Sequence, residues 1–246
     1  MGLLDSSRTF VRPIFRALYE RDQTGVTWLP KLLSLANRCP PGLDLGVVQQ
    51  PPSFEFPAKS PSDFLAWLVM HPADLSWPKN YEIKSEKARE KRQKLLAGDA
   101  AVRQEFLEAI RTPPKERIKW WLLEGSSKID CALFTKRAVV FIEGKRTERS
   151  ASAEISWYPY RNQLLRNLDC ARWCAHQRSC DYYSLLVTTK DRLRIGDRAV
   201  KEEIVSASLP HLVESGTSAE VLSHFLGAAT WIDIVTELDL PPTMLE

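Results

Sequence analysis

The pattern of hydrophobic and polar positions predicts a helical first third of the chain, broken by one irregular segment. Apolar residues recur at helical spacing within residues 1–38, which are therefore expected to be helical. Residues 40–63 are rich in Pro, Gly and Ser, and predict a meandering connection. A short apolar helix is expected at residues 64–70. The charge pattern of residues 82–110 predicts one long or two consecutive exposed helices.

The middle of the chain predicts strands. Residues 117–125 have a strand-like pattern, and residues 128–135 and 138–147 are short apolar segments separated by a turn. A helix is expected to begin near Pro159. Residues 182–189 form another nearly continuous apolar run, and a strand reached through a crossover helix is usually parallel to a buried neighbour.

Two further helices are expected at residues 198–208 and 220–238. This order predicts an α/β fold with a central mixed β-sheet flanked by helices. It also suggests two parts: a helical and irregular N-terminal extension, residues 1–80, and a main domain, residues 81–246.

Three charged residues interrupt the two central strands. Asp130 lies in the first strand, and Glu143 and Lys145 lie in the second. Glu143 and Lys145 are two residues apart, so they share one face of the strand, about 6.6 Å apart along it. The midpoint of positions 130 and 143 falls in the turn at residues 135–137, so a hairpin would place the two carboxylates opposite each other.

Two carboxylates at that separation repel each other, and either one pKa rises or the sheet is destabilised. A divalent cation removes the repulsion, and Mg²⁺ prefers oxygen ligands and retains part of its water shell. Lys145 beside such a site can orient an attacking water and offset charge on a phosphate. The other interpretation is a structural, salt-bridged hairpin.

The spacing Asp130, twelve residues, then Glu143-Gly144-Lys145 resembles the signature of the PD-(D/E)XK nuclease superfamily, and the likeness covers a core of about residues 100–195. It implies a restriction-endonuclease-like core to which the N-terminal helical extension is added. It further implies that Asp130, Glu143 and the Gly144 carbonyl bind Mg²⁺, for which Mn²⁺ can substitute, and that Lys145 acts on the nucleophilic water.

The same resemblance implies further site residues. Glu124 corresponds to an additional acidic metal ligand of many members, with Glu108 as its rival, and Gln163 corresponds to a glutamine that projects toward the site. Ile129 stands where the superfamily signature often has proline, a position that varies widely among members.

Four residues are candidates for contact with nucleic acid. Arg161 and Arg166 flank Gln163, Arg146 follows the catalytic lysine, and Tyr160 belongs to an aromatic group that begins at Trp157. The aromatic residues could stack on bases or belong to the core.

Charge and cysteine content add two constraints. The net charge is +3, but eight acidic residues and no Lys or Arg follow Lys201, so residues 1–201 carry +11 and suit an anionic partner. No apolar run is long enough for a transmembrane helix, and no secretory signal is evident.

Five cysteines argue against a disulfide-linked partner and for a reducing, cytoplasmic location. Cys170, Cys174 and Cys180 lie close together in the sequence, and structural thiols are favoured there over a zinc site or an iron–sulfur cluster.

The sequence therefore predicts an Mg²⁺-dependent phosphodiesterase acting on nucleic acid, most readily DNA. The alternative is a catalytically inactive binding or scaffold protein with the same fold. Endonuclease or exonuclease action, DNA or RNA as substrate, and a homodimeric state are all left open.

Overall fold

The computed structural model describes residues 6–75, 86–112, 125–146 and 158–245, and statements below refer to these ranges. The strand expected at residues 117–125 lies outside them, except for Gly125. The predicted domain boundary near residue 80 also falls outside them.

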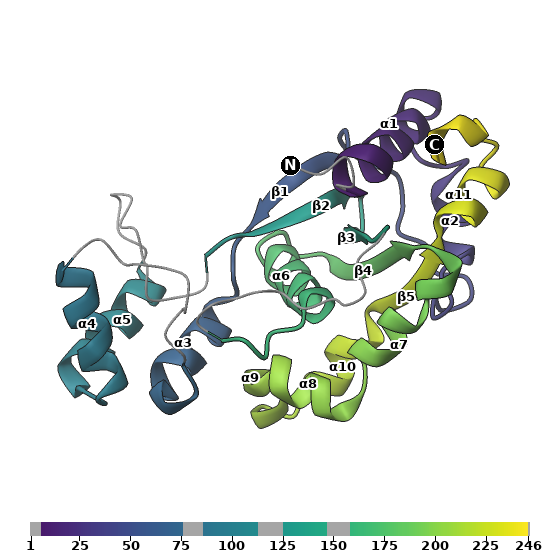
Figure 1. Cartoon of the computed structure of the whole chain (residues 1–246). Helices are drawn as coiled ribbons and strands as arrows, with labels where there is room; N and C mark the ends of the chain where they lie inside the picture. Colours follow the sequence, from purple (N-terminus) through teal and green to yellow (C-terminus); the bar gives the residue numbers. More distant parts are fainter. Residues whose placement is uncertain (1–5, 76–85, 113–124, 147–157, 246) are drawn as a thin grey trace.

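A five-stranded mixed β-sheet forms the centre of the described molecule (Figure 1). Its strands, in spatial as well as chain order, are β1 (Ser53–Ala58), β2 (Ser127–Phe134), β3 (Ala138–Gly144), β4 (Asp181–Thr188) and β5 (Phe225–Thr230). The pairs β1–β2 and β2–β3 are antiparallel, whereas β3–β4 and β4–β5 are parallel. The parallel pairs follow from the crossover connections that precede β4 and β5.

Helices surround this sheet. The α-helices are α1 (Arg12–Arg21), α2 (Leu29–Ser34), α3 (Ser62–Met70), α4 (Glu86–Leu96), α5 (Ala100–Arg111), α6 (Gln163–His176), α7 (Arg194–Ala199), α8 (Glu202–Ser208), α9 (Pro210–Glu214), α10 (Ser218–Ser223) and α11 (Trp231–Glu237). Four shorter helical turns are η1 (Ser7–Val11), η2 (Pro72–Asp74), η3 (Lys190–Arg192) and η4 (Pro242–Leu245).

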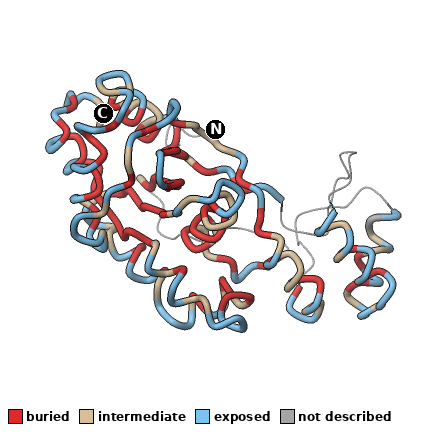
Figure 2. Tube along the Cα trace, turned by 180° about the vertical axis from the view of Figure 1, so that it is seen from behind, coloured by how far each residue is buried: buried red, intermediate tan, exposed pale blue. Residues whose placement is uncertain are grey.

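Different helices pack on the two faces of the sheet. Helices α1, α2 and α11 pack on one face, against alternate residues such as Val140, Ile142 and Val187. Helix α6 covers the other face, where Phe141 and Leu186 lie. Figure 2 shows the buried trace concentrated in the strands and in the helix surfaces that meet them. Period-two alternation in the strands therefore builds a three-layer α/β/α arrangement.

The predicted α/β class with a mixed sheet is confirmed, as are the strands on either side of the residue 135–137 turn, helix α6 and strand β4. Two predictions were wrong. Residues 40–63 were expected to be irregular but contain β1, and residues 220–238 were expected to be one helix but contain β5 between α10 and α11. The described part of the N-terminal extension thus supplies an edge strand and helices that share the main core.

Strand β5 has a local irregularity at Gly227. This residue has φ of +84°, and the register between β4 and β5 shifts at this position. The side chain of Asn37 accepts a hydrogen bond from the Ala228 backbone N–H at 2.8 Å. A side chain at position 227 would collide with Asn37 and would also be strained at this φ, so glycine is needed here.

Gly144, at the end of β3, lies in close contact with the helices on the opposite face of the sheet from α6. A Cβ atom there would overlap Val11 and would lie 3.0 Å from Trp231. We expect Gly144→Ala to reduce the free energy of unfolding by about 1–3 kcal/mol, because overpacking displaces buried neighbours. Urea denaturation measures the change. Gly125→Ala is the control, since nothing lies within 4 Å of its Cβ position; an equal effect of both variants would contradict the overpacking argument.

Candidate active site

The β2–β3 hairpin determines how the two carboxylates lie. Cys131 pairs with Ile142, and extending this antiparallel register by one residue places Asp130 opposite Glu143. Residues paired in this way project from the same face of a sheet. The face is the one covered by α6, because Phe141, two residues before Glu143, packs there. The predicted antiparallel β2–β3 hairpin is confirmed, and its register, extended by one residue, gives the two carboxylates opposed positions.

Asp130 is partly buried and its carboxylate is bound to the backbone of β3. Its Oδ2 accepts a hydrogen bond from the Gly144 N–H at 2.8 Å. Burial raises the pKa of the neighbouring Cys131 thiol well above its usual value, and the charge of Asp130 raises it further. The hydrogen bond fixes the carboxylate at the end of β3.

Glu143 is 3% exposed, and three side chains donate to its carboxylate. Gln163 Nε2 lies 2.6 Å and Lys145 Nζ 2.9 Å from Oε1, and Asn167 Nδ2 lies 2.8 Å from Oε2. Lys145, itself only 7% exposed, also donates to Gln163 Oε1 at 2.8 Å. Glu143, Lys145 and Gln163 thus form a closed triangle of contacts, with Asn167 bound to the remaining carboxylate oxygen.

Helix α6 supplies both amide side chains. Asn162 caps its N-terminus by accepting from the N–H groups of Leu164 and Leu165. Gln163 and Asn167 are four residues apart, so they lie on the same face of the helix, one turn apart. Because α6 runs back from the end of β3, its first two turns lie above Glu143. The sequence identified Gln163 but missed Asn167, which the i, i+4 spacing could have revealed.

Two backbone carbonyl groups near the site accept hydrogen bonds from side chains near the two ends of the chain. Ser6 Oγ donates to the Gly144 carbonyl at 2.7 Å, and Trp231 Nε1 donates to the Lys145 carbonyl at 3.0 Å. Both donors belong to the face opposite α6. No local sequence pattern indicates that residues 6 and 231 support this segment.

The residues predicted to contact nucleic acid differ in their exposure and in their contacts. Tyr160 is 62% exposed and packs edge-on against Tyr158, with ring centroids 5.4 Å apart. Arg166 donates to the Gly125 carbonyl at 3.3 Å, and Arg146 lies 4.4 Å above the ring of Phe10.

Of the two candidates for an additional acidic ligand, the structure describes Glu108 alone. Glu124 lies outside the described residues. Glu108 is exposed on α5, which packs against α3 and α4 at a distance from the sheet (Figure 1). Its side chain accepts a hydrogen bond from Thr112 at 3.4 Å. Glu108 therefore does not fit the ligand role.

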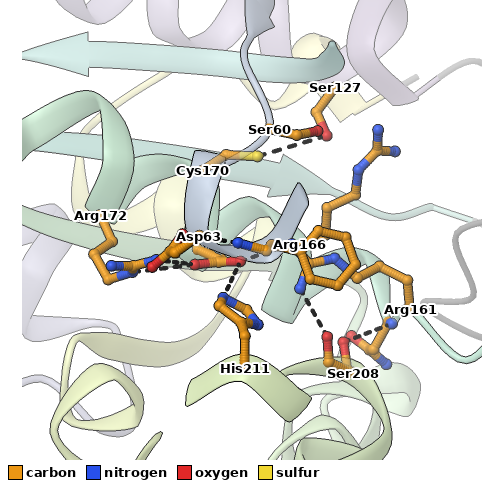
Figure 3. A network of polar contacts seen from close by, with 12 residues as sticks. Ser60, Asp63, Ser127, Arg161, Arg166, Cys170, Arg172, Ser208 and His211 are labelled. Carbon is orange, nitrogen blue, oxygen red and sulfur yellow. Dashed lines mark hydrogen bonds and ion pairs between the residues drawn. The ribbon is translucent and has the colours of Figure 1, made fainter. Parts of the chain in front are cut away.

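Arg161 does not fit its predicted role in nucleic-acid contact, because its guanidinium group is buried. It donates to Asp169 and to the Ser208 carbonyl, each at 2.7 Å, and lies over the ring of Phe64. Figure 3 shows this network between α3, α6 and the start of α9. The physical reason is that Asp169, itself fully buried, needs a cationic partner.

The oxygen atoms around β3 suit a hard cation. Asp130 and Glu143 offer carboxylates from paired strands, and the Gly144 carbonyl has a second lone pair beyond the one used by Ser6. Two carboxylates and a carbonyl, completed by waters, match the ligand preference of Mg²⁺. Within the described ranges no group of three or more His, Cys, Asp or Glu residues could hold a metal. All five cysteines are free thiols, and Cys170 is buried against the sheet.

No family model, no curated protein and no solved structure matches this chain. The residues and the order of the sheet are therefore the only basis for the superfamily resemblance. Across the described helices, none is both long and apolar enough to span a membrane.

Proposed function

We propose that this protein is an Mg²⁺-dependent nuclease that hydrolyses phosphodiester bonds, with DNA as its substrate. One observation carries the proposal: the β2–β3 register, extended by one residue beyond the Cys131–Ile142 pair, opposes Asp130 to Glu143, and Lys145 Nζ lies 2.9 Å from Glu143. The order β2, β3, α6, β4 also supports a restriction-endonuclease-like core, because it combines an antiparallel hairpin with a parallel strand reached through a helix.

The metal and the chain have separate roles in this proposal. Mg²⁺ would be held by Asp130, Glu143 and the Gly144 carbonyl, and it supplies Lewis acidity that activates water and stabilises charge on phosphate. Lys145 provides an ammonium group at the same face, able to orient a water or to donate to a phosphate oxygen. Gln163 fixes the Lys145 ammonium group and the Glu143 carboxylate relative to each other, because its Oε1 accepts from Lys145 and its Nε2 donates to Glu143. Asn167 fixes the far oxygen of Glu143.

The substrate assignment has weaker but consistent support. Phosphate is an anion, and residues 1–201 carry +11. Tyr160, three residues before Gln163, presents an exposed ring near the start of α6 that could stack on a base.

A specific observation favours the alternative of an inactive binding protein. Glu143 and Lys145 are both buried, and two side-chain amides and an ammonium group contact the Glu143 carboxylate. A purely structural ion pair would have the same contacts. The two alternatives differ in whether a divalent cation can displace the ammonium group from the carboxylate.

Metal dependence tests the proposal directly. The full chain with Mg²⁺ or Mn²⁺ is expected to cleave duplex or single-stranded DNA, and a chelator should reduce the rate to background, because cleavage without the cation lacks both charge stabilisation and an activated water. Gel analysis of labelled DNA measures the rate, and re-addition of Mg²⁺ should restore it. Calorimetric titration with Mn²⁺ separates the alternatives: no uptake of metal together with metal-independent DNA binding would favour the inactive protein.

A further inference from the structure

Thr188, the last residue of β4, carries a buried hydroxyl group with no partner. The residue is 0% exposed, and its Oγ1 has no hydrogen-bond partner among the described residues. A buried hydroxyl without a partner destabilises the folded state, so most such groups are paired. A valine of the same shape would avoid this penalty.

The position of Thr188 links it to the site. β3 and β4 are parallel, with Gly144 paired to Val187, and the Lys145 N–H donates to the Val187 carbonyl at 2.8 Å. The ladder therefore continues by one residue and places Thr188 beside Lys145. Adjacent residues of neighbouring strands lie about 4.8 Å apart and project from the same face. That face is the one where Lys145 meets Glu143 and Gln163.

A cation at Glu143 would change the surroundings of Lys145. In the described structure the ammonium group is bound to Glu143 Oε1 and Gln163 Oε1. A divalent cation on the same carboxylate repels the ammonium group, which would then lose its contact with Glu143 and depend on neutral acceptors, of which Gln163 Oε1 is one. Two positive charges within about 4 Å in a buried site repel each other strongly.

We propose that Thr188 is a positioning residue whose hydroxyl oxygen accepts a hydrogen bond from the Lys145 ammonium group when a divalent cation occupies Asp130 and Glu143. This inference rests on the proposed nuclease function and deepens it. Thr188 gives the displaced lysine a second fixed position beside the cation. The lysine thus stays available to the water or phosphate instead of competing with the metal for Glu143.

Calorimetric titration with Mn²⁺ is the test, with the full chain and three single variants. Thr188→Val should weaken Mn²⁺ binding by a factor of about 10–100, since it removes an acceptor for a charged donor. Thr188→Ser should restore the affinity. Ser184→Ala is the matched control: Ser184 is another buried, unpartnered hydroxyl on the same face of β4, four residues away from Thr188. Its affinity should equal that of the parent, and Thr188→Val should unfold at the same or higher temperature.

A double-mutant cycle identifies the partner of Thr188. In a Lys145→Met background the ammonium group is gone, so Thr188→Val should no longer change Mn²⁺ affinity. DNA cleavage by Thr188→Val should recover at saturating Mn²⁺, because excess cation overcomes the competition for Glu143.

The possible failures can be told apart. Equal Mn²⁺ affinity of Thr188→Val and the parent overturns the role of Thr188 and leaves the nuclease proposal intact. An effect of the same size in the Lys145→Met background also overturns it, because the hydroxyl would then act on something other than the lysine. A parent protein that takes up no Mn²⁺ overturns the nuclease proposal itself, and the Thr188 proposal with it.

Discussion

Asp130→Asn is expected to reduce metal-dependent DNA cleavage by a factor of about 10³ or more, since the loss of an anionic ligand removes several kcal/mol of stabilisation by the cation. The fold should remain, because the asparagine Oδ1 can still accept the Gly144 N–H that Asp130 binds at 2.8 Å. Initial cleavage rates of a labelled duplex at fixed Mg²⁺ concentration measure the effect. Asp130 is the most informative position because the change affects one charge and one ligand.

Changes at Glu143 or Lys145 are harder to interpret. Each is buried and contacts the other, so removing one leaves an uncompensated charge and destabilises the protein. A loss of activity there does not separate unfolding from a damaged site, whereas the Mn²⁺ affinity of the Lys145→Met background is measured on protein that is folded.

The control for Asp130→Asn is Asp181→Asn. Asp181 is an exposed aspartate of the same sheet, at the start of β4, and its substitution should leave the cleavage rate unchanged. Urea unfolding of both variants should match the parent within about 1 kcal/mol, as is usual for changes outside the core. Cleavage by Asp130→Asn at more than about a tenth of the parental rate would remove Asp130 from the metal site, because a ligand is worth more than a factor of ten.

The sequence predicted the part of the site whose geometry depends on residues close together in the chain. Asp130 and Glu143 belong to a hairpin whose turn is only a few residues long, and the length of a hairpin turn restricts the register of its strands. A slip by one residue would turn Phe141 and its neighbours away from α6. Local pattern therefore fixed which carboxylates oppose each other.

The contacts that the sequence did not predict come from residues far away in the chain. Ser6 and Trp231 reach the backbone of Gly144 and Lys145 from residues 138 and 86 positions away. Their hydrogen bonds depend on how α1 and α11 pack on the sheet, which no short pattern encodes. The edge strand β1 was missed because Pro57 and the preceding Pro and Gly residues resemble a loop.

Arg161 shows an error of another kind. A local pattern predicted contact with nucleic acid, but the side chain is buried in the folded structure. An arginine beside a tyrosine and a glutamine resembles a surface that binds phosphate. Its actual partners are Asp169, eight residues later, and the Ser208 carbonyl, 47 residues later. Burial of Asp169 decides the outcome, because a buried carboxylate without a cation is too costly.

Asp169→Asn is expected to lower the free energy of unfolding by about 3 kcal/mol, because it leaves the guanidinium group of Arg161 buried without an anion. Both side chains are 0% exposed and their atoms lie 2.7 Å apart. His211 Nε2 lies 3.2 Å and Arg172 Nη2 2.9 Å from the same carboxylate. Urea denaturation at pH 7 measures the loss. The matched control is Asp63→Asn: Asp63 pairs with the same Arg172, but its side chain is 43% exposed, so the expected change is at most about 1 kcal/mol.

The stabilisation by Asp169 should depend on pH in a defined direction. Burial alone would raise the pKa of Asp169, but the charge of Arg161, the hydrogen bond from His211 and the charge of Arg172 outweigh burial and hold that pKa well below its usual range. A carboxylate whose pKa is lower in the folded than in the unfolded state stabilises the protein above the unfolded value, near 3.9, and loses that effect as pH falls toward the folded value. The difference in stability between parent and Asp169→Asn should therefore be constant from about pH 7 to 5 and shrink below about pH 4. A difference that stays constant down to pH 3 would show that the carboxylate charge is not the source of the stabilisation.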